Sequence, residues 1–357
     1  MTLSLNFDDI DMLTLGSALL GSGGGGNANI GGLLLKTAMK NFHSDSIELV
    51  DPSKISNHSQ LICSSGMGSP TIGAEKLPSG KEYDHALRKL ENSLGHEFDY
   101  ISPIEIGGVN SIVPFVTSLF RGLPVMDGDG EGRAFPELQM TTFNLYGIPS
   151  MPMCLVDERG NELVINAMDN DWAEKISRSV TSRFGGRGYL ANYPMNGTQY
   201  RKSVIPNSVS RAVDLGRLLS EGSHEGNAEE RLLDEAGARK LFDGKLVDLV
   251  RDNRGGFSIG YALFRSEMGG MVRTSRIRFQ NEYLFYDEEE NGMMSEKVCT
   301  PQIICVLDSE TYVPLTTDRL RYGIRCKIYT LPVSEKWNHP GAMKLIGREA
   351  FKVLDSI

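Results

Sequence analysis

Five charged side chains lie in an eleven-residue loop that follows a short apolar segment: Asp127, Asp129, Glu131, Arg133 and Glu137. Carboxylates on a glycine-rich backbone suit general acid and base catalysis, so Asp127, Asp129 and Glu137 are candidate catalytic residues. Arg133 is expected either to bind a substrate carboxylate with its planar fork of donors or to lower the pKa of a neighbouring carboxyl group. Because alternate residues of an extended segment point the same way, Asp127 and Asp129 are predicted to face one cleft.

Two other interpretations of this loop stay open. Asp127 and Asp129 are also suited to hold a divalent metal ion. Otherwise the loop is a solvated acidic turn, although the apolar residues 134–136 that follow it indicate partial burial. A helix-loop-helix calcium site is not indicated, because its twelfth position requires a bidentate Glu and is Leu138 here.

The second candidate site is the stretch GSGGGGN at residues 21–27, which matches the G-x-G-x-x-G pattern of dinucleotide-binding loops. That pattern requires a strand before the loop. Here residues 7–20 and 30–42 both have helical apolar spacing, so neither NAD nor a flavin is predicted as a cofactor. Consecutive N–H groups at the start of a helix bind anions, and glycine lets the backbone approach them closely. The favoured interpretation is a site for a carboxylate or oxyanion made by Gly23, Gly24, Gly25, Gly26 and Asn27. A flexible loop between helices is the alternative.

Three predicted strands end in further glycine-bearing loops. QLICS leads to Met67 and Gly68, PIEI leads to Gly108 and Asn110, and PVM leads to the acidic loop. Ligands of parallel sheets bind outside the carboxyl ends of the strands. These loops are therefore predicted to line one substrate-binding cleft together with the glycine stretch, unless they are ordinary turns in a chain that contains 39 glycines.

The composition is typical of a globular protein with two domains. The chain has 357 residues, a net charge of -9 and a pI near 5.3, which disfavours nucleic acid and membrane surfaces as partners. No apolar run approaches the ~20 residues of a membrane helix and no signal peptide is recognisable, so a cytoplasmic location is predicted. The five cysteines and six histidines are dispersed, so neither a disulfide framework nor a zinc site is indicated.

Hydrophobic patterning predicts an α/β fold in two parts. In residues 1–170, short β-type runs alternate with helical ones, which indicates a mainly parallel sheet in a three-layer α/β/α domain. Residues 171–357 are expected to hold helices at 208–220 and 228–242, followed by a β-rich barrel or sandwich. One strand is predicted to span residues 271–289 without interruption. The boundary is placed loosely, near residues 165–185, and the chain is allowed to cross it more than once.

Several of these segments resemble a known family. SGMGSPTIGAEK, EIGGVNS, GSGGGGN and LPVMDGDGEGRAFPELQMTT, with GGFSIG, FQNEYL and LRYG in the C-terminal half, are similar to motifs of the S-methyl thiohydantoin desulfurase family. That family was long catalogued as a domain of unknown function and is related by gene context to hydantoinase and oxoprolinase pathways. The chain departs from its pattern at Asn27 and Ala28, where Asp-Pro is usual, and at Gly128 and Glu131 in the acidic loop.

The resemblance implies an α/β N-terminal domain, a barrel-like C-terminal domain and hydrolytic loss of methanethiol from an S-methylated thiohydantoin ring. In that chemistry water adds to the ring carbon between two nitrogens. Asp127 or Asp129 would be the base, Arg133 and the backbone of residues 23–26 would hold anionic groups, and Asn110 and Glu137 would orient the reactants. The rival interpretation is a non-catalytic binding or regulatory subunit that serves a hydantoinase- or oxoprolinase-like partner. A homo-oligomer is a further expectation.

Overall fold

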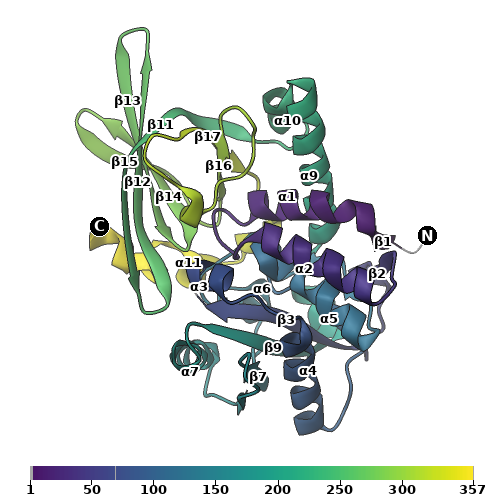
Figure 1. Ribbon diagram of the computed structural model, residues 1–357. Helices are drawn as coiled ribbons and strands as arrows, with labels where there is room; N and C mark the ends of the chain where they lie inside the picture. Colours follow the sequence, from purple (N-terminus) through teal and green to yellow (C-terminus); the bar gives the residue numbers. More distant parts are fainter. Residues whose placement is uncertain (1–2, 69, 357) are drawn as a thin grey trace.

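The computed structural model describes residues 3–68 and 70–356, and Figure 1 shows an α/β part beside a β part. This confirms the two-domain α/β class predicted from the sequence. The helices are α1 (Ile10–Leu20), α2 (Ala28–Asn41), α3 (Pro70–Glu75), α4 (Lys81–Leu94), α5 (Val113–Arg121), α6 (Thr142–Leu145), α7 (Asn170–Arg183), α8 (Gly197–Ser203), α9 (Ser208–Glu225), α10 (Ala228–Asp234) and α11 (Ala342–Ile346). The 3-10 segments are η1 (Phe7–Asp9), η2 (Pro52–Lys54), η3 (Gly108–Ser111), η4 (Thr317–Arg319), η5 (Glu335–Asn338) and η6 (Arg348–Ser356).

The first sheet has eight strands in the order β1-β2-β5-β4-β3-β9-β7-β8. Their bounds are β1 (Leu3–Asn6), β2 (Ser46–Val50), β5 (Val125–Met126), β4 (Tyr100–Ser102), β3 (Gln60–Gly68), β9 (Arg187–Asn196), β7 (Met153–Val156) and β8 (Glu162–Ile165). Only β2, β5, β4 and β3 run parallel among the described strands, and the other neighbouring pairs are antiparallel. The prediction of a mainly parallel sheet is therefore wrong, and the sheet is mixed.

Helices cover both faces of this sheet. Side chains of α4 and α5 belong to a buried cluster with one face of β3, β7 and β9, and side chains of α6, α7 and α8 belong to a cluster with the other face. The α/β part is thus a three-layer arrangement. Strand β9 lies between β3 and β7 in this sheet although it follows residue 170. The expected division into residues 1–170 and 171–357 stays a prediction.

Helices α1 and α9 pack closely and connect the two parts. A Cβ atom added at Gly16 would lie 1.7 Å from the carbonyl oxygen of Ala212, and one added at Gly216 would lie 1.9 Å from that of Met12. The two glycines therefore permit backbone contact that no larger residue allows. One buried cluster joins these helices to β2 and to two strands of the second sheet. The end of α1 and the start of α9 are fixed relative to both sheets.

The second sheet is antiparallel and has the order β15-β14-β13-β12-β11-β17-β16. It forms a half-barrel from β15 (Met293–Cys299), β14 (Glu282–Glu290), β13 (Met271–Gln280), β12 (Phe257–Met268), β11 (Arg239–Arg254), β17 (Arg325–Leu331) and β16 (Ile303–Asp308). A separate pair is made by β6 (Gly128–Asp129) and β10 (Ile205–Pro206). The mainly β character predicted for the C-terminal part is confirmed.

Two expected elements differ in length. The helix predicted at 228–242 ends at Asp234, because Gly237 has a φ of 65° and the chain enters β11 at Arg239. The strand predicted at 271–289 is divided into β13 and β14 by Asn281, which has a φ of 59°. Asn tolerates this left-handed conformation better than most residues. The break matters because it brings the first residue of β14 into the cleft described below.

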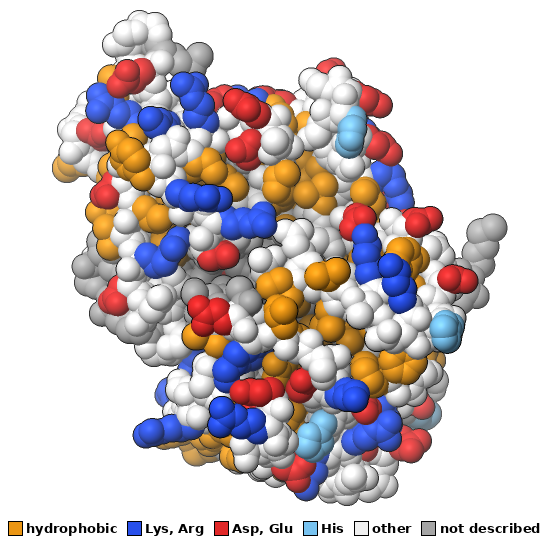
Figure 2. All heavy atoms as spheres, viewed as in Figure 1, with side chains coloured by type: hydrophobic (Ala, Val, Ile, Leu, Met, Phe, Trp, Pro, Cys, Tyr) orange, Lys and Arg blue, Asp and Glu red, His pale blue; other side chains and the backbone are white. Residues whose placement is uncertain are grey.

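The surface in Figure 2 shows basic and acidic side chains interspersed on the visible face. Within the described part of the chain, none of the helices combines the length and apolar character that crossing a bilayer would require.

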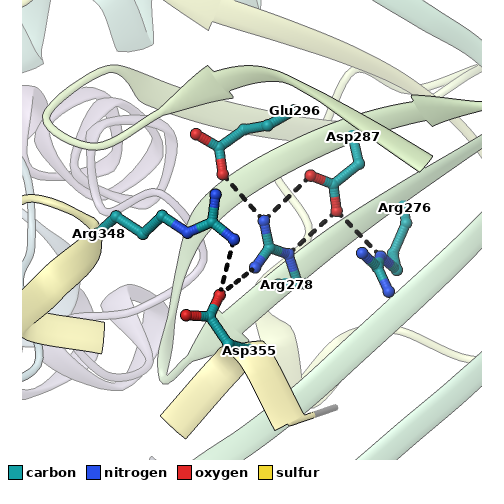
Figure 3. Close-up of polar contacts among 6 residues, drawn as sticks. All are labelled: Arg276, Arg278, Asp287, Glu296, Arg348 and Asp355. Carbon is teal, nitrogen blue, oxygen red and sulfur yellow. Dashed lines mark hydrogen bonds and ion pairs between the residues drawn. The ribbon is translucent and has the colours of Figure 1, made fainter. Parts of the chain in front are cut away.

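The C-terminal segment is attached to the second sheet through Arg278, which is 4% exposed (Figure 3). Its guanidinium contacts Asp287 at 3.0 and 3.1 Å, Glu296 at 3.0 Å and Asp355 of η6 at 3.5 Å. Asp355 also pairs with Arg348 at 3.1 Å. One buried cation therefore connects three neighbouring strands to the end of the chain.

Replacing Arg278 by Ala is expected to lower the free energy of unfolding by about 2 kcal/mol, because the buried Asp287 loses two hydrogen bonds and keeps Arg276, at 2.9 Å, as its ionic partner. Arg273→Ala is the matched control on the same strand. Its side chain is 59% exposed and pairs with Glu288, so its loss should cost less than about 1 kcal/mol. Urea unfolding of both variants at neutral pH measures the difference, and equal effects would contradict the anchoring role of Arg278.

Candidate active site

A polar cavity of about 90 Å³ lies where the loops of the first sheet meet the β13–β14 turn. Its described lining includes six residues predicted from the sequence, namely Gly25, Gly26, Met67, Gly68, Asn110 and Glu137. It also includes Gly66, Glu105, Glu131, Arg178, Arg187, Asn281 and Glu282. The remaining candidates lie outside this lining, and they are Gly23, Gly24, Asn27, Gly108, Asp127, Asp129 and Arg133.

The glycine stretch connects α1 to α2, which confirms that helices flank it on both sides. Its anion-binding N–H group is used by the chain itself, since Gly25 N donates to Oε1 of Glu282 at 3.2 Å. A Cβ atom on Gly24 would lie 1.9 Å from the same oxygen. Asn27 caps α2 by accepting from Asn29 N. The glycines therefore admit a carboxylate, and that carboxylate belongs to a residue 257 positions further along the chain.

Glu282 is the first residue of β14 and is 3% exposed. Burial raises its pKa to about 7, although the N–H of Gly25 and the charge of Arg133 favour the ionised form. Its second oxygen, Oε2, is buried and has no hydrogen-bond partner among the described residues. Near neutral pH this side chain is thus a partly ionised carboxyl group with one free acceptor atom, which suits a general base.

Glu105 belongs to the same lining and is 5% exposed. Asn110 Nδ2 donates to its Oε1 at 2.5 Å, while Oε2 is buried without a partner among the described residues. Burial and then the charge of Glu282 raise the pKa of Glu105 well above its usual range. The raised pKa favours the protonated form of Glu105, which suits a general acid. Two carboxyl groups in one cavity, each with a raised pKa, are a common arrangement of an acid and a base.

Asn110 holds this wall of the cavity in place. Its side-chain oxygen accepts from Gly66 N at 2.8 Å, and its amide nitrogen donates to the carbonyl oxygen of Gly66 at 3.1 Å as well as to Glu105. The side chain thus ties β3 to Glu105. Gly108 lies nearby in η3 and contacts the glycine stretch, because a Cβ there would lie 2.3 Å from the Gly25 backbone.

Two further carboxyl groups lie around this pair. Glu131 lines the cavity and accepts from Phe135 N at 2.7 Å, and burial followed by the charge of Glu105 raises its pKa well above the usual range. Asp129 accepts from Glu131 N at 3.0 Å and from Gly132 N at 2.8 Å. Burial raises the pKa of Asp129 to about 7. Asp129 therefore shapes the loop that carries Glu131.

Glu137 and the two arginines complete the polar lining. Glu137 accepts from Gln139 at 2.6 Å, and burial followed by the charge of Glu174 raises its pKa. Arg178 is neutralised by Glu174 at 2.6 Å. Arg187 has no such ion pair among the described residues.

Arg133, expected to bind an anion of the substrate, is instead 1% exposed and donates to carbonyl oxygens of the chain. Its Nη1 contacts Gln302 O at 2.7 Å, its Nη2 contacts Tyr283 O at 2.9 Å and its Nε contacts Ala134 O at 3.0 Å. The side chain thus joins the acidic loop to the second sheet. Its positive charge favours the ionised form of Glu282, although Arg133 does not line the cavity.

Asp127 points to the start of α9 rather than into the cavity. Its Oδ1 accepts from Val209 N and Ser210 N at 3.1 and 3.0 Å, and its Oδ2 accepts from Ser210 Oγ at 2.5 Å. The expectation that Asp127 and Asp129 face one cleft therefore needs correction, because neither is among the described residues of the cavity lining. The described residues also hold no group of three or more His, Cys, Asp or Glu side chains arranged to bind a metal ion.

Asp127→Ala is expected to lower the free energy of unfolding by about 1–2 kcal/mol, the usual cost of losing a helix cap. Asp127→Asn should lose less, because its carbonyl oxygen still accepts from the two N–H groups. Asp214→Ala, on the same helix with a side chain that is 74% exposed, is the control and should have little effect. Thermal unfolding of the three variants tests the order, and equal stability of Asp127→Ala and Asp214→Ala would refute a capping role.

The decisive carboxyl groups were not identified as candidates from the sequence. Glu105 lies in PIEI and Glu282 in FQNEYL, two segments that were noted only as a strand and as a family-like motif. The available signal was that Glu105 lies between two isoleucines and that Glu282 lies between Asn281, a residue common in turns, and an apolar run. Nothing in their spacing indicates that they meet.

Comparisons with known proteins agree over nearly the whole chain. Residues 8–167 match the family model described as S-Me-THD-like, N-terminal domain, and residues 168–356 match the S-Me-THD-like, C-terminal domain. The crystal structure of a protein from Chromobacterium violaceum is similar with a TM-score of 0.81 and 22% identity, over 98% of this chain and 97% of that chain. At this identity the likeness concerns the fold alone. None of the curated proteins compared matches the chain.

Proposed function

The chain belongs to the S-Me-THD-like family, and we propose that it is a hydrolase that releases a thiol from an S-alkylated thiohydantoin ring. One observation carries the proposal. Glu105 and Glu282 line the same small cavity, and each has one buried carboxyl oxygen without a partner among the described residues. Such atoms are costly to bury unless a ligand satisfies them. A water molecule can donate to the free oxygen of Glu282, and the double-bonded ring nitrogen of an S-alkylated thiohydantoin can accept from a protonated Glu105.

The reaction begins with addition of water to the ring carbon between the two nitrogens. The ionised Glu282 takes a proton from the water as the C–O bond forms, and the protonated Glu105 gives its proton to the ring nitrogen that loses its double bond. The product of this step is a tetrahedral carbon that carries a hydroxyl group and the thioether sulfur.

Collapse of that intermediate reverses the two roles. Glu105 takes the hydroxyl proton as the carbonyl bond forms, and Glu282 gives its proton to the sulfur as the C–S bond breaks. The ring becomes a hydantoin, one thiol leaves and one water is consumed. Both carboxyl groups return to their starting states, so the cycle requires no oxidant or reductant.

Three observations support this assignment over a solvated acidic loop. Both carboxyl groups are buried, burial raises the pKa of Glu282 to about 7 and raises that of Glu105, and Asn110 contacts Glu105 through Oε1 and leaves Oε2 without a partner among the described residues. Catalysis near neutral pH uses carboxyl groups whose pKa is raised towards the working pH.

The alternative is a binding or regulatory subunit that serves a hydantoinase- or oxoprolinase-like partner. Incubation of the protein alone with S-methyl thiohydantoins, followed with a thiol-reactive dye, separates the two functions. The hydrolase should release thiol in proportion to the ring consumed. A binding subunit should bind the ring and return it unchanged, and that outcome would refute the proposal.

A further inference from the structure

Arg187 is a buried cation without an anionic partner. It is 8% exposed, it lies in the lining of the cavity, and no carboxylate of the described residues forms an ion pair with it. Its contacts are with Tyr83, whose hydroxyl group lies 3.4 Å from Nη2, and with the ring of Tyr189 at 5.5 Å. Its Nε is buried and has no hydrogen-bond partner among the described residues, and neither has the hydroxyl group of Tyr189.

An arginine in this state is costly for the fold. Burying an unpaired charge destabilises a protein unless a partner or ligand compensates it. The other arginine of the lining shows the contrast, because Arg178 is paired with Glu174 at 2.6 Å and also donates to Pro136 O at 3.0 Å. Arg187 is therefore the cation in this lining whose charge is available to a ligand.

The space next to Arg187 is left open by a glycine. An ideal Cβ atom on Gly66 would lie 3.6 Å from Arg187 Nη2, from Asn110 Oδ1 and from the hydroxyl oxygen of Tyr83. The guanidinium group of Arg187 and the hydroxyl group of Tyr83 thus approach the face of Gly66 that carries no side chain. Asn110 contacts Gly66 and also donates to Glu105 at 2.5 Å, so one side chain links this face to the proposed acid.

We propose that Arg187 is the specificity-determining residue of the cavity and that it receives a carboxylate carried by the ring substrate in the space beside Gly66. The inference rests on the proposed function for the ring itself. A carboxylate is the ligand that fits best, since it is planar, pairs with the guanidinium fork in two parallel hydrogen bonds and supplies the missing negative charge. The hydroxyl group of Tyr83 is placed to donate to the same group.

The test compares three S-methyl thiohydantoins whose side chains have the same length and end in a carboxylate, a primary amide or a methyl group. Thiol release by the wild-type protein should favour the carboxylate in kcat/KM by roughly 10- to 100-fold, the usual effect of a charged hydrogen-bonded pair. Arg187→Met should abolish this preference, and Arg187→Lys should keep part of it. Gly66→Ala fills the space and should lower the rate for the carboxylate substrate most. Arg217→Gln, at an arginine outside the cavity lining, is the control.

The melting temperature gives a second readout. Arg187→Met removes an unpaired buried charge, so its melting temperature should equal or exceed that of the wild type. A lower melting temperature with an unchanged substrate preference would show that Arg187 is structural, and equal rates for the three rings with the wild-type protein would also overturn the inference.

Failure of the proposed function is distinguishable from failure of this inference. If none of the three rings releases thiol, binding of the same rings is measured by calorimetry. Tightest binding of the carboxylate ring, lost in Arg187→Met, would still support Arg187 as the anion receptor. Equal binding of the three rings, or no binding, would overturn it.

Discussion

Replacing Glu282 by Gln is expected to reduce turnover by a factor of ~10² to 10⁴, because the substitution keeps the shape of the side chain and removes its ability to accept a proton. Glu289→Gln is the matched control on β14, where the side chain is exposed and outside the cavity lining. Thiol release by both variants measures the effect. A folded Glu282→Gln variant with wild-type turnover would exclude Glu282 as the base.

The pH dependence follows from the pKa of Glu282 near 7. A base acts in its ionised form, so kcat/KM of the wild type should fall as the pH decreases below about 7. Stability should change in the opposite direction. The folded-state pKa is raised above the ordinary carboxyl value, so the stabilisation of the protonated form is present at low pH and is lost as the pH rises through about 7. Glu282→Gln resembles the protonated form and should therefore be at least as stable as the wild type at pH 8.

Replacing Glu105 by Gln is expected to reduce turnover by a similar factor, because the variant cannot give a proton to the ring nitrogen. The carbonyl oxygen of Gln can still accept from Asn110, so the cavity wall should keep its structure. Glu97→Gln, exposed in the same region of the sequence, is the control. Binding of the ring should persist in Glu105→Gln while thiol release is lost.

The two variants should not have additive effects. Glu105 and Glu282 exchange protons with the same ring carbon and its substituents, so the double variant is expected to be about as slow as the slower single variant. Multiplication of the two losses would indicate that the carboxyl groups act in independent steps. Retention of wild-type turnover by Glu105→Gln would exclude it as the acid.

The local elements near the cavity could be predicted because their signals are local. The helices on both sides of the glycine stretch follow from apolar spacing within residues 7–20 and 30–42, and the structure has α1 and α2 there. Strand β9 was missed, because Asn192 and Pro194 disfavour a strand and the bulge that accommodates them depends on pairing with β3. Its central position in the sheet is a tertiary effect.

The candidate site could be predicted only in part, for the same reason. Met67, Gly68, Asn110 and Glu137 were found because they follow strands that end at one edge. Glu282 reaches the glycine stretch from the other part of the chain, and no spacing in the sequence links it to Gly25.

The aspartates show how an alternation argument fails. Alternation along an extended segment predicts that Asp127 and Asp129 share a direction. Asp127 instead accepts from the start of α9, 82 residues later, and Asp129 turns back to the N–H groups of its own loop. Partners at long sequence separation decide the direction of Asp127 and the contacts of Arg133, whereas N–H groups two and three residues further along decide that of Asp129.

The central claim is that this cavity hydrolyses a C–S bond of a thiohydantoin-type ring. Its most direct test is the reaction of the purified wild-type protein with an S-methyl thiohydantoin in water enriched in heavy oxygen, with the thiol and the ring product both quantified. We expect one thiol for each ring consumed and one heavy oxygen atom in the new carbonyl group, with both signals lost in Glu282→Gln. Recovery of the intact ring, or thiol release that Glu282→Gln leaves unchanged, would contradict it.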